Sequence, residues 1–342
     1  MRLATNWISA EKAAFAFYPG SFTIASMLVR GVLALLYGGV VLFAGFEPQS
    51  IAEEAIVPSL AERLGYGPQE RLLIVHADDV GVAHSVNRAT FAAMDRGPVN
   101  SASIMVPCPW LGEVAEYAAT HPDRDFGLHL TLTSEWKHYK WGPVSPWNRV
   151  SSLVDVYGHF YSIVQQALEQ ADASEAEAEI RAQVEKARSF GIEPTHLDSH
   201  MGVLFRTPEL FEAYLKVGRE YGIPVMVART FATFAPHISE ALHERDPVLD
   251  HLVMLNQMIE PEQWPEFYFN AIRNLQPGVT ELIVHLAYDD EEMRGVTVDH
   301  PDFGSTWRQQ DFDAMTSPEL EAVLKEEGVR LITWREIQGL VR

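Results

Sequence analysis

From residue 71 onward, short apolar segments rich in β-branched residues alternate with longer amphipathic segments, and this alternation constrains the fold more than any other feature. It is typical of parallel α/β architecture, in which a helix follows each strand and returns the chain. The candidate strands are Leu72–His76, Ala102–Val106, Phe126–Leu132, Thr195–Ser199, Ile223–Ala228, Leu282–Leu286 and Arg330–Thr333. The candidate helices span residues 84–96, 111–120, 174–190, 208–221, 262–275 and 317–327.

Two architectures fit this pattern, an open doubly wound sheet and a closed barrel. Functional residues gather at the switch point of an open sheet, whereas a barrel carries them on loops after many strands around one rim. Polar residues here follow the first, third, fourth and sixth candidate strands, which favours the barrel. We therefore predict an irregular (β/α) barrel of about seven parallel strands over residues 71–342, with segments 134–172 and 287–316 forming a substrate cleft.

The N-terminal region lies outside the repeating pattern. Residues 31–46, GVLALLYGGVVLFAGF, are uncharged, and the basic residues Arg2, Lys12 and Arg30 precede them. This run is short for a membrane span and long for a signal-peptide core, but either interpretation places the following domain across a membrane. A buried core helix is the alternative.

We expect residues 1–50 to be a signal sequence or a membrane anchor and residues 51–70 to be a linker. The domain at 71–342 is then exported to the periplasm or the exterior, or held at a membrane. The sequence leaves open whether the segment is cleaved and whether Met1 or Met27 is the start.

Composition excludes one class of partner. The formal net charge is −21, and the sequence contains no run of lysine and arginine that could form a local basic patch. We therefore expect no nucleic-acid binding. The single cysteine, Cys108, cannot form an intramolecular disulfide, and its apolar surroundings are typical of a core thiol.

Carboxylates and histidines follow several predicted strands. The first strand runs into HADDVG, where Asp78 and Asp79 stand side by side. Adjacent side chains diverge at a strand end, so one carboxylate can bind a cation while the other stays free to take a proton. In FGLHLTLT, His129 lies on the face opposite the leucines, which predicts that it points into the barrel.

The fourth strand ends in Asp198 and His200, and the sixth holds His285 near its end. Taken singly, an Asp pair can be a turn and a strand histidine can be a core residue. In a barrel they converge on one rim, where a carboxylate and two imidazoles form an open site for zinc, iron, cobalt, nickel or manganese. Such a metal activates water and polarises a carbonyl, which predicts a hydrolase with a remaining carboxylate and histidine as base and acid.

Four ordered segments resemble the motifs of the YdjC-like (ChbG/HpnK) carbohydrate deacetylases, which are related to the NodB-type polysaccharide deacetylases. They are HADDVGVAHSVNRATFAAMDRGPVNSASIMV, FGLHLTLT, PTHLDSHMG and TELIVHLAYD, and the resemblance covers about residues 72–335. It implies an irregular barrel that removes N-acetyl groups from an amino sugar or oligosaccharide and releases acetate. It also implies one divalent metal ion, either zinc or magnesium, with cobalt, manganese, nickel and iron as alternatives.

The same resemblance implies roles for individual residues. Asp79, His129 and His200 match the family's metal ligands, Asp78 its catalytic base, and His285 a histidine suited to protonating the leaving amine. Two positions depart from the pattern. Met201 stands where many members have further histidines, which bears on substrate choice, and Leu286-Ala287 replaces a frequent Pro-Gly, which weakens the assignment of His285.

Two further residues are candidates for substrate binding. Arg229 follows the fifth predicted strand and could orient Asp78 or grip the substrate, with a loop salt bridge as the alternative. Trp141, like Trp136 and Trp147 in the same segment, could stack on a sugar face, with a local core as the alternative.

Two other functions fit the same residues. One is metal-dependent hydrolysis of another amide or of an ester, because nothing in these motifs recognises the leaving group. The other is a catalytically silent barrel that binds glycan, although a pure binder has no need of Asp78 beside a metal ligand. We expect an N-acetylated carbohydrate as the substrate and membrane contact through the N-terminal segment only. The family resemblance is compatible with a homodimer.

Overall fold

The computed structural model describes residues 58–342. The predicted signal sequence or anchor at 1–50, and the linker as far as residue 57, lie outside the described residues. Between Pro58 and Arg342, no helix is long and apolar enough to cross a membrane.

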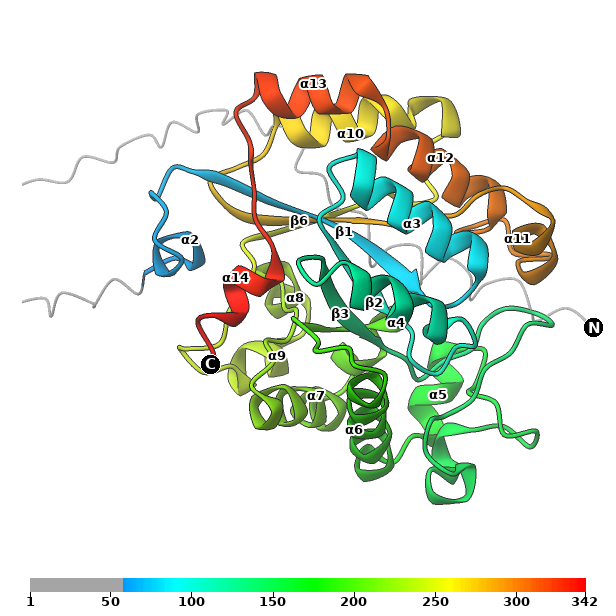
Figure 1. Ribbon diagram of the computed structural model, residues 1–342. Coiled ribbons are helices and arrows are strands. Elements are labelled where there is room, and N and C mark those ends of the chain that lie inside the picture. Colours follow the sequence, from blue (N-terminus) through cyan, green and yellow to red (C-terminus); the bar gives the residue numbers. More distant parts are fainter. Residues whose placement is uncertain (1–57) are drawn as a thin grey trace, which may run out of the picture. The chain divides into compact units, whose positions relative to one another are not determined.

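Parallel strands form the centre of the described domain (Figure 1). The strands are β1 (Arg71–Val80), β2 (Ser101–Ile104), β3 (Asp125–Leu130), β4 (Leu197–Ser199), β5 (His251–Met254), β6 (Gly278–Val284) and β7 (Arg330–Leu331). Their order is β4-β3-β2-β1-β6-β5, and β7 pairs with the first half of β1 at Leu72 and Leu73.

An extended segment at 223–228 lies between β4 and β5, the two ends of this strand order, and closes the sheet into a barrel. Val225 bridges to Leu197 of β4, and Ala228 bridges to Leu249, just before β5. Backbone hydrogen bonds join the same partners, with Met226 N to Leu197 O at 2.7 Å and Leu249 N to Val227 O at 2.9 Å. The predicted irregular (β/α) barrel is confirmed, with the segment 223–228 as its least regular part.

Two predicted strand positions need correction. Residues 223–228 make only isolated bridges, because this segment contacts β4 and the chain before β5 at different points and Pro224 has no N–H to donate. The strand His251–Met254 was not predicted. It is four residues long and only partly buried, so its apolar run Leu252–Met254 is too short to distinguish from an apolar loop by pattern alone.

Helices surround the strands (Figure 1). The α-helices are α2 (Leu60–Arg63), α3 (His84–Arg96), α4 (Leu111–Thr120), α5 (Val164–Gln170), α6 (Ala173–Ser189), α7 (Pro208–Tyr221), α8 (Arg229–Phe234), α9 (Pro236–Ala241), α10 (Trp264–Arg273), α11 (Glu291–Val296), α12 (Ser305–Met315), α13 (Pro318–Glu326) and α14 (Trp334–Gln338). Short 3₁₀ turns are η1 (Trp147–Arg149), η2 (Ser151–Leu153), η3 (His200–Phe205) and η4 (Pro261–Gln263).

The bounds of α7 show why the sequence defines its helices well. Thr207 caps the first turn by accepting a hydrogen bond from Leu210 N, and Pro208 occupies the first helical position, where its missing N–H costs nothing. Gly222 ends the helix in the left-handed conformation, with φ of 63°. Each of the six predicted helical segments contains a helix at nearly the expected bounds.

Alternate side chains of β1 enter two different environments. Leu73, Val75 and Ala77 pack in the larger apolar cluster with α3, whereas Leu72 and Ile74 pack with α2 and α14 in a smaller cluster. Because strand side chains alternate, the face that carries Leu72 and Ile74 continues to His76 and Asp78. The inner face of β1 therefore changes from apolar to polar toward its carboxyl end.

Candidate metal centre and active site

The end of β1 separates the two adjacent carboxylates. The pairing of β1 with β2 shifts register between Ala77 and Val80, and Asp79 adopts a positive φ of 69°. This left-handed conformation is strained for most residues but tolerated by aspartate. Asp78 consequently remains in line with the inner face of β1, while Asp79 turns toward residues from β3, η3 and α12.

Asp79, His129 and His200 form a compact group with the geometry of a cation site. Asp79 Oδ1 lies 3.4 Å from His129 Nε2 and 3.4 Å from His200 Nδ1, and all three side chains are buried. The three ligand atoms lie within 4.8 Å of one another. Asp79 Oδ1 is buried with no hydrogen-bond partner in the described structure, a costly state that a bound cation would relieve.

Both imidazoles are oriented from their far sides by carboxylates. His129 Nδ1 lies 2.7 Å from Asp198 Oδ1, and His200 Nε2 lies 3.0 Å from Glu135 Oε2. Since a carboxylate accepts hydrogen bonds, these nitrogens carry the protons and the opposite nitrogens are free to face Asp79. Carboxylate–histidine pairs of this kind are typical of metal ligands, so the residues present fit a divalent cation.

Arg308 of α12 supplies a buried positive charge to the same group. Its Nη2 donates to Asp79 Oδ2 at 2.6 Å, and the guanidinium lies 5.7 Å from the centre of the Trp136 ring. Burial by itself would raise the pKa of Asp79, but Arg308 and then His200 hold that pKa well below its usual range. Asp79 is therefore ionised, with one oxygen bound by Arg308 and the other left for a cation.

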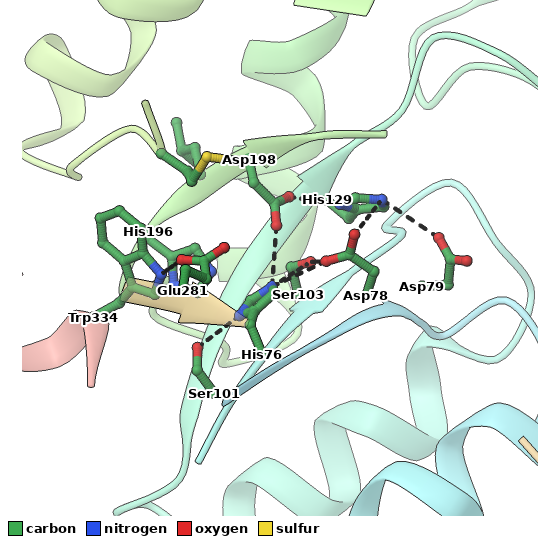
Figure 2. Close-up of polar contacts among 12 residues, drawn as sticks. His76, Asp78, Asp79, Ser101, Ser103, His129, His196, Asp198, Glu281 and Trp334 are labelled. Carbon is green, nitrogen blue, oxygen red and sulfur yellow. Dashed lines mark hydrogen bonds and ion pairs between the residues drawn. The ribbon is translucent and has the colours of Figure 1, made fainter. Parts of the chain in front are cut away.

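Asp78 and His285 lie beside the group. Asp78 Oδ2 is 3.8 Å from His129 Nε2 and 3.7 Å from His285 Nε2. Figure 2 shows Asp78 and Asp79 on the same side of His129, each with a carboxylate oxygen toward its ring. The His285 ring packs on Phe303, and burial lowers the pKa of His285 to about 4. The structure thus brings all five residues of the predicted catalytic and metal site together.

The two predicted substrate-binding residues are placed differently. Trp141 is only 3% exposed, donates from Nε1 to Thr133 O, and meets the His200 ring edge-on at 6.2 Å. It packs against His200, and it has little exposed surface on which a sugar could stack. Arg229 pairs with Asp250, whose other oxygen accepts from Val279 N at the start of β6. Since His285 follows the other end of β6, the structure does not bring Arg229 to Asp78.

Several site residues were not assigned roles from the sequence. Glu135 follows β3 closely, and Asp198 lies two residues before His200 on the same face of the chain, so position at a strand end was an available signal for both. Arg308 had no such signal. It is 229 residues from Asp79 in the chain.

Comparisons with known proteins agree with this geometry. The sequence profile of the YdjC-like protein family matches residues 72–326. A carbohydrate deacetylase of Thermus thermophilus is 32% identical over 82% of this chain and 98% of its own length. A carbohydrate deacetylase of Geobacillus stearothermophilus is 31% identical over 79% of this chain and 99% of its own.

A solved structure supports the fold alone. A crystal structure from Enterococcus faecalis, provisionally described as a cellobiose-phosphate cleavage protein, superposes with a TM-score of 0.67 at 23% identity. The match covers 78% of this chain and 99% of that one.

Proposed function

This chain belongs to the YdjC-like protein family, and we propose that it is a metal-dependent carbohydrate deacetylase that removes the N-acetyl group of an amino sugar or oligosaccharide. One observation carries the metal dependence. The buried Asp79 Oδ1 has no hydrogen-bond partner among the described residues and faces two histidines whose far nitrogens are bound to carboxylates. The named activity of the two relatives supports an acetylated carbohydrate as substrate.

Each site residue has a distinct task in this proposal. Asp79, His129 and His200 hold the cation, for which zinc and magnesium are the leading candidates and cobalt, manganese, nickel and iron the others. A divalent cation in this site would lower the pKa of water and polarise the amide carbonyl. Asp198 and Glu135 keep the two imidazoles in the tautomers that the site requires.

Proton transfer falls to Asp78 and His285. Asp78 accepts a proton from the attacking water, and His285 Nε2, 3.7 Å away, can receive it and pass it to the departing nitrogen. Because burial depresses the pKa of His285, the protonated ring is a strong acid toward an amine. Water and the acetamide are thereby converted to acetate and the free amine of the sugar.

The position of Asp78 also bears on the alternative functions. A silent glycan-binding barrel has no use for a buried carboxylate 3.8 Å from the free nitrogen of a ligand histidine. This favours an enzyme. Hydrolysis of another amide or an ester remains the second candidate, since the residues described here would act on the carbonyl and on the transferred proton in the same way in either case.

We also propose that the reaction takes place outside the cytoplasm. The support is the uncharged run at residues 31–46 with basic residues before it. The domain would then act as an exported or membrane-anchored enzyme, and its substrate would be an extracytoplasmic carbohydrate. Fractionation of cells that express the full chain, followed by N-terminal sequencing, tests both export and cleavage.

The catalytic proposal is tested by acetate release from N-acetylated mono- and oligosaccharides. Full-length protein stripped with a chelator is assayed before and after addition of zinc, magnesium, cobalt, manganese, nickel or iron, beside Asp78→Asn. The matched control is Asp250→Asn, just before β5 and away from the group. We expect metal-dependent release that Asp78→Asn abolishes and Asp250→Asn retains. If no acetate is released although one metal ion is bound per chain, deacetylation is wrong and hydrolysis of another amide or of an ester becomes the leading function.

A further inference from the structure

A further buried histidine, on β1, lies directly behind the proposed active site. His76 is one inward-facing position before Asp78 and is completely buried. Its Nε2 lies 3.1 Å from Asp198 Oδ2, 3.2 Å from Asp78 Oδ1 and 3.1 Å from Ser103 Oγ. Figure 2 shows this nitrogen between the two carboxylates.

Hydrogen-bond roles indicate that both ring nitrogens of His76 carry protons. Ser101 Oγ donates to Asp125 Oδ1, a pure acceptor when ionised, so it accepts from His76 Nδ1 at 3.0 Å. Nε2 faces two carboxylates and must donate as well. A ring that donates from both nitrogens is an imidazolium, and the surrounding carboxylates raise the pKa of His76 well above its usual value although burial opposes this.

The two carboxylates that share His76 serve different parts of the site. Asp198 uses its Oδ2 for His76 and its Oδ1 for His129, at 2.7 Å. Asp78 is the base of the proposed reaction. Without a positive charge between them, these two buried carboxylates would repel each other, because Arg308 is already engaged with Asp79.

We propose that His76 is a positioning residue that fixes the base Asp78 and the ligand His129 relative to each other, by bridging Asp78 directly and His129 through Asp198. Its effect on catalysis rests on the deacetylation proposed above, whereas its effect on the His129 orientation does not. Figure 2 shows the chain of contacts from Asp78 through His76 and Asp198 to His129. The substrate is not expected to contact His76, so turnover should change much more than substrate binding.

The barrel provides a matched control at the next histidine. His196 is also completely buried, and its ring meets the His76 ring edge-on at 4.9 Å. Its Nδ1 lies 2.9 Å from Thr195 Oγ1, and its ring stacks on Trp334. Within residues 58–342, no hydrogen bond joins His196 to Asp78 or Asp198. Loss of either imidazole removes similar packing, but only His76 connects the base and the ligand.

The experiment compares His76→Gln with His196→Gln in the full-length protein. Outer partners of metal ligands typically contribute about 10–100-fold, so we expect kcat for acetate release to fall by this factor in His76→Gln with KM within about twofold. The visible absorption bands of the Co²⁺-loaded protein should shift in His76→Gln, since they report ligand geometry. In His196→Gln both kcat and the Co²⁺ spectrum should stay close to wild type.

Thermal unfolding of both variants measures the packing loss that they share. His76→Asn replaces His76→Gln if the latter does not fold.

The outcomes separate this inference from the proposed function. Equal kcat and identical Co²⁺ spectra in the two glutamine variants would overturn the inference, as would a kcat loss that only follows a common loss of thermal stability. If the wild type releases no acetate but His76→Gln alone shifts the Co²⁺ spectrum, deacetylation fails and the positioning role stands.

Discussion

Arg308 Nη2 and Asp79 Oδ2 form a buried ion pair at 2.6 Å, which joins α12 to the end of β1 across most of the chain. The pair leaves Asp79 with a single free oxygen and places a cation beside the position where a metal would bind. Arg308 thus balances the charge of Asp79 when no metal is present, and its positive charge would repel a divalent cation bound to the other oxygen.

Arg308→Met should destabilise the metal-free protein more than the metal-loaded protein. Removing one partner of a buried pair costs about 3–5 kcal/mol because the remaining charge is uncompensated, and a bound divalent cation supplies that compensation. Urea unfolding with chelator and with Zn²⁺ measures the difference, and by linkage the variant should bind Zn²⁺ more tightly. The control is Arg229→Met, an exposed pair with Asp250, expected to lose less than about 1 kcal/mol in both conditions. Equal losses for Arg308→Met in both conditions would contradict the role assigned to Arg308.

Glu135→Gln should weaken metal binding without unfolding the protein. The amide can still accept a hydrogen bond from His200 Nε2, but it no longer supplies the negative charge that makes the imidazole a better ligand. We expect about a tenfold higher dissociation constant in a chelator competition assay. Glu185→Gln, which changes a carboxylate bound to the Tyr221 hydroxyl at the surface, serves as the control. An unchanged constant for Glu135→Gln would show that His200 is oriented by other groups, with Trp141 the first to examine.

Glu281, inside the barrel on β6, should make stability fall as the pH rises. Burial raises the pKa of Glu281 from 4.5 to about 7, despite the opposing charge of His76. Below pH 4.5 the carboxyl is protonated in both the folded and the unfolded chain, and its contribution is fully present. Between pH 4.5 and about pH 7, only the unfolded chain releases the proton of Glu281. The free energy of unfolding therefore decreases by up to about 3 kcal/mol as the pH rises through this range.

Glu281→Gln removes this dependence, because the amide stays neutral and can still accept from Trp334 Nε1. Urea unfolding at pH 5 and pH 8 should show the variant gaining stability relative to wild type at the higher pH. Asp311, whose pKa burial also raises to about 7, contributes a similar slope to both proteins and cancels in the comparison. Glu116→Gln, exposed on α4, is the control. A constant difference between variant and wild type at the two pH values would contradict this prediction.

Gly127→Ala should destabilise the barrel, because the added methyl would lie 2.4 Å from the His196 ring. The ring is held by Trp334 and by Thr195, so it cannot move aside without disturbing them. Overpacking of this kind costs about 1–3 kcal/mol. Gly112→Ala provides the contrast, since a methyl in α4 meets nothing within 4 Å and should stabilise the helix by up to about 1 kcal/mol. Thermal unfolding of the two variants should therefore shift in opposite directions.

The local features of this protein were accessible from the sequence because they depend on periodicity. The alternation of FGLHLTLT places Phe126 and Leu128 in the helix-facing core and His129 inside the barrel, as expected. The same reasoning gave the helical segments, the barrel and the position of Asp78 and Asp79 at a strand end. Short or irregular elements carry little periodic signal, so β5 was missed and the segment 223–228 was predicted as a regular strand although it makes only isolated bridges.

What the sequence by itself determined is therefore which residues can be catalytic and on which face of a strand each one lies. Only the tertiary structure decided their partners: Arg308 on Asp79, His76 between Asp78 and Asp198, and Arg229 away from the site. The physical reason is that hydrogen bonds and ion pairs across a barrel depend on strand register, closure and loop path. These are set by the packing of the whole domain, and no local pattern records them.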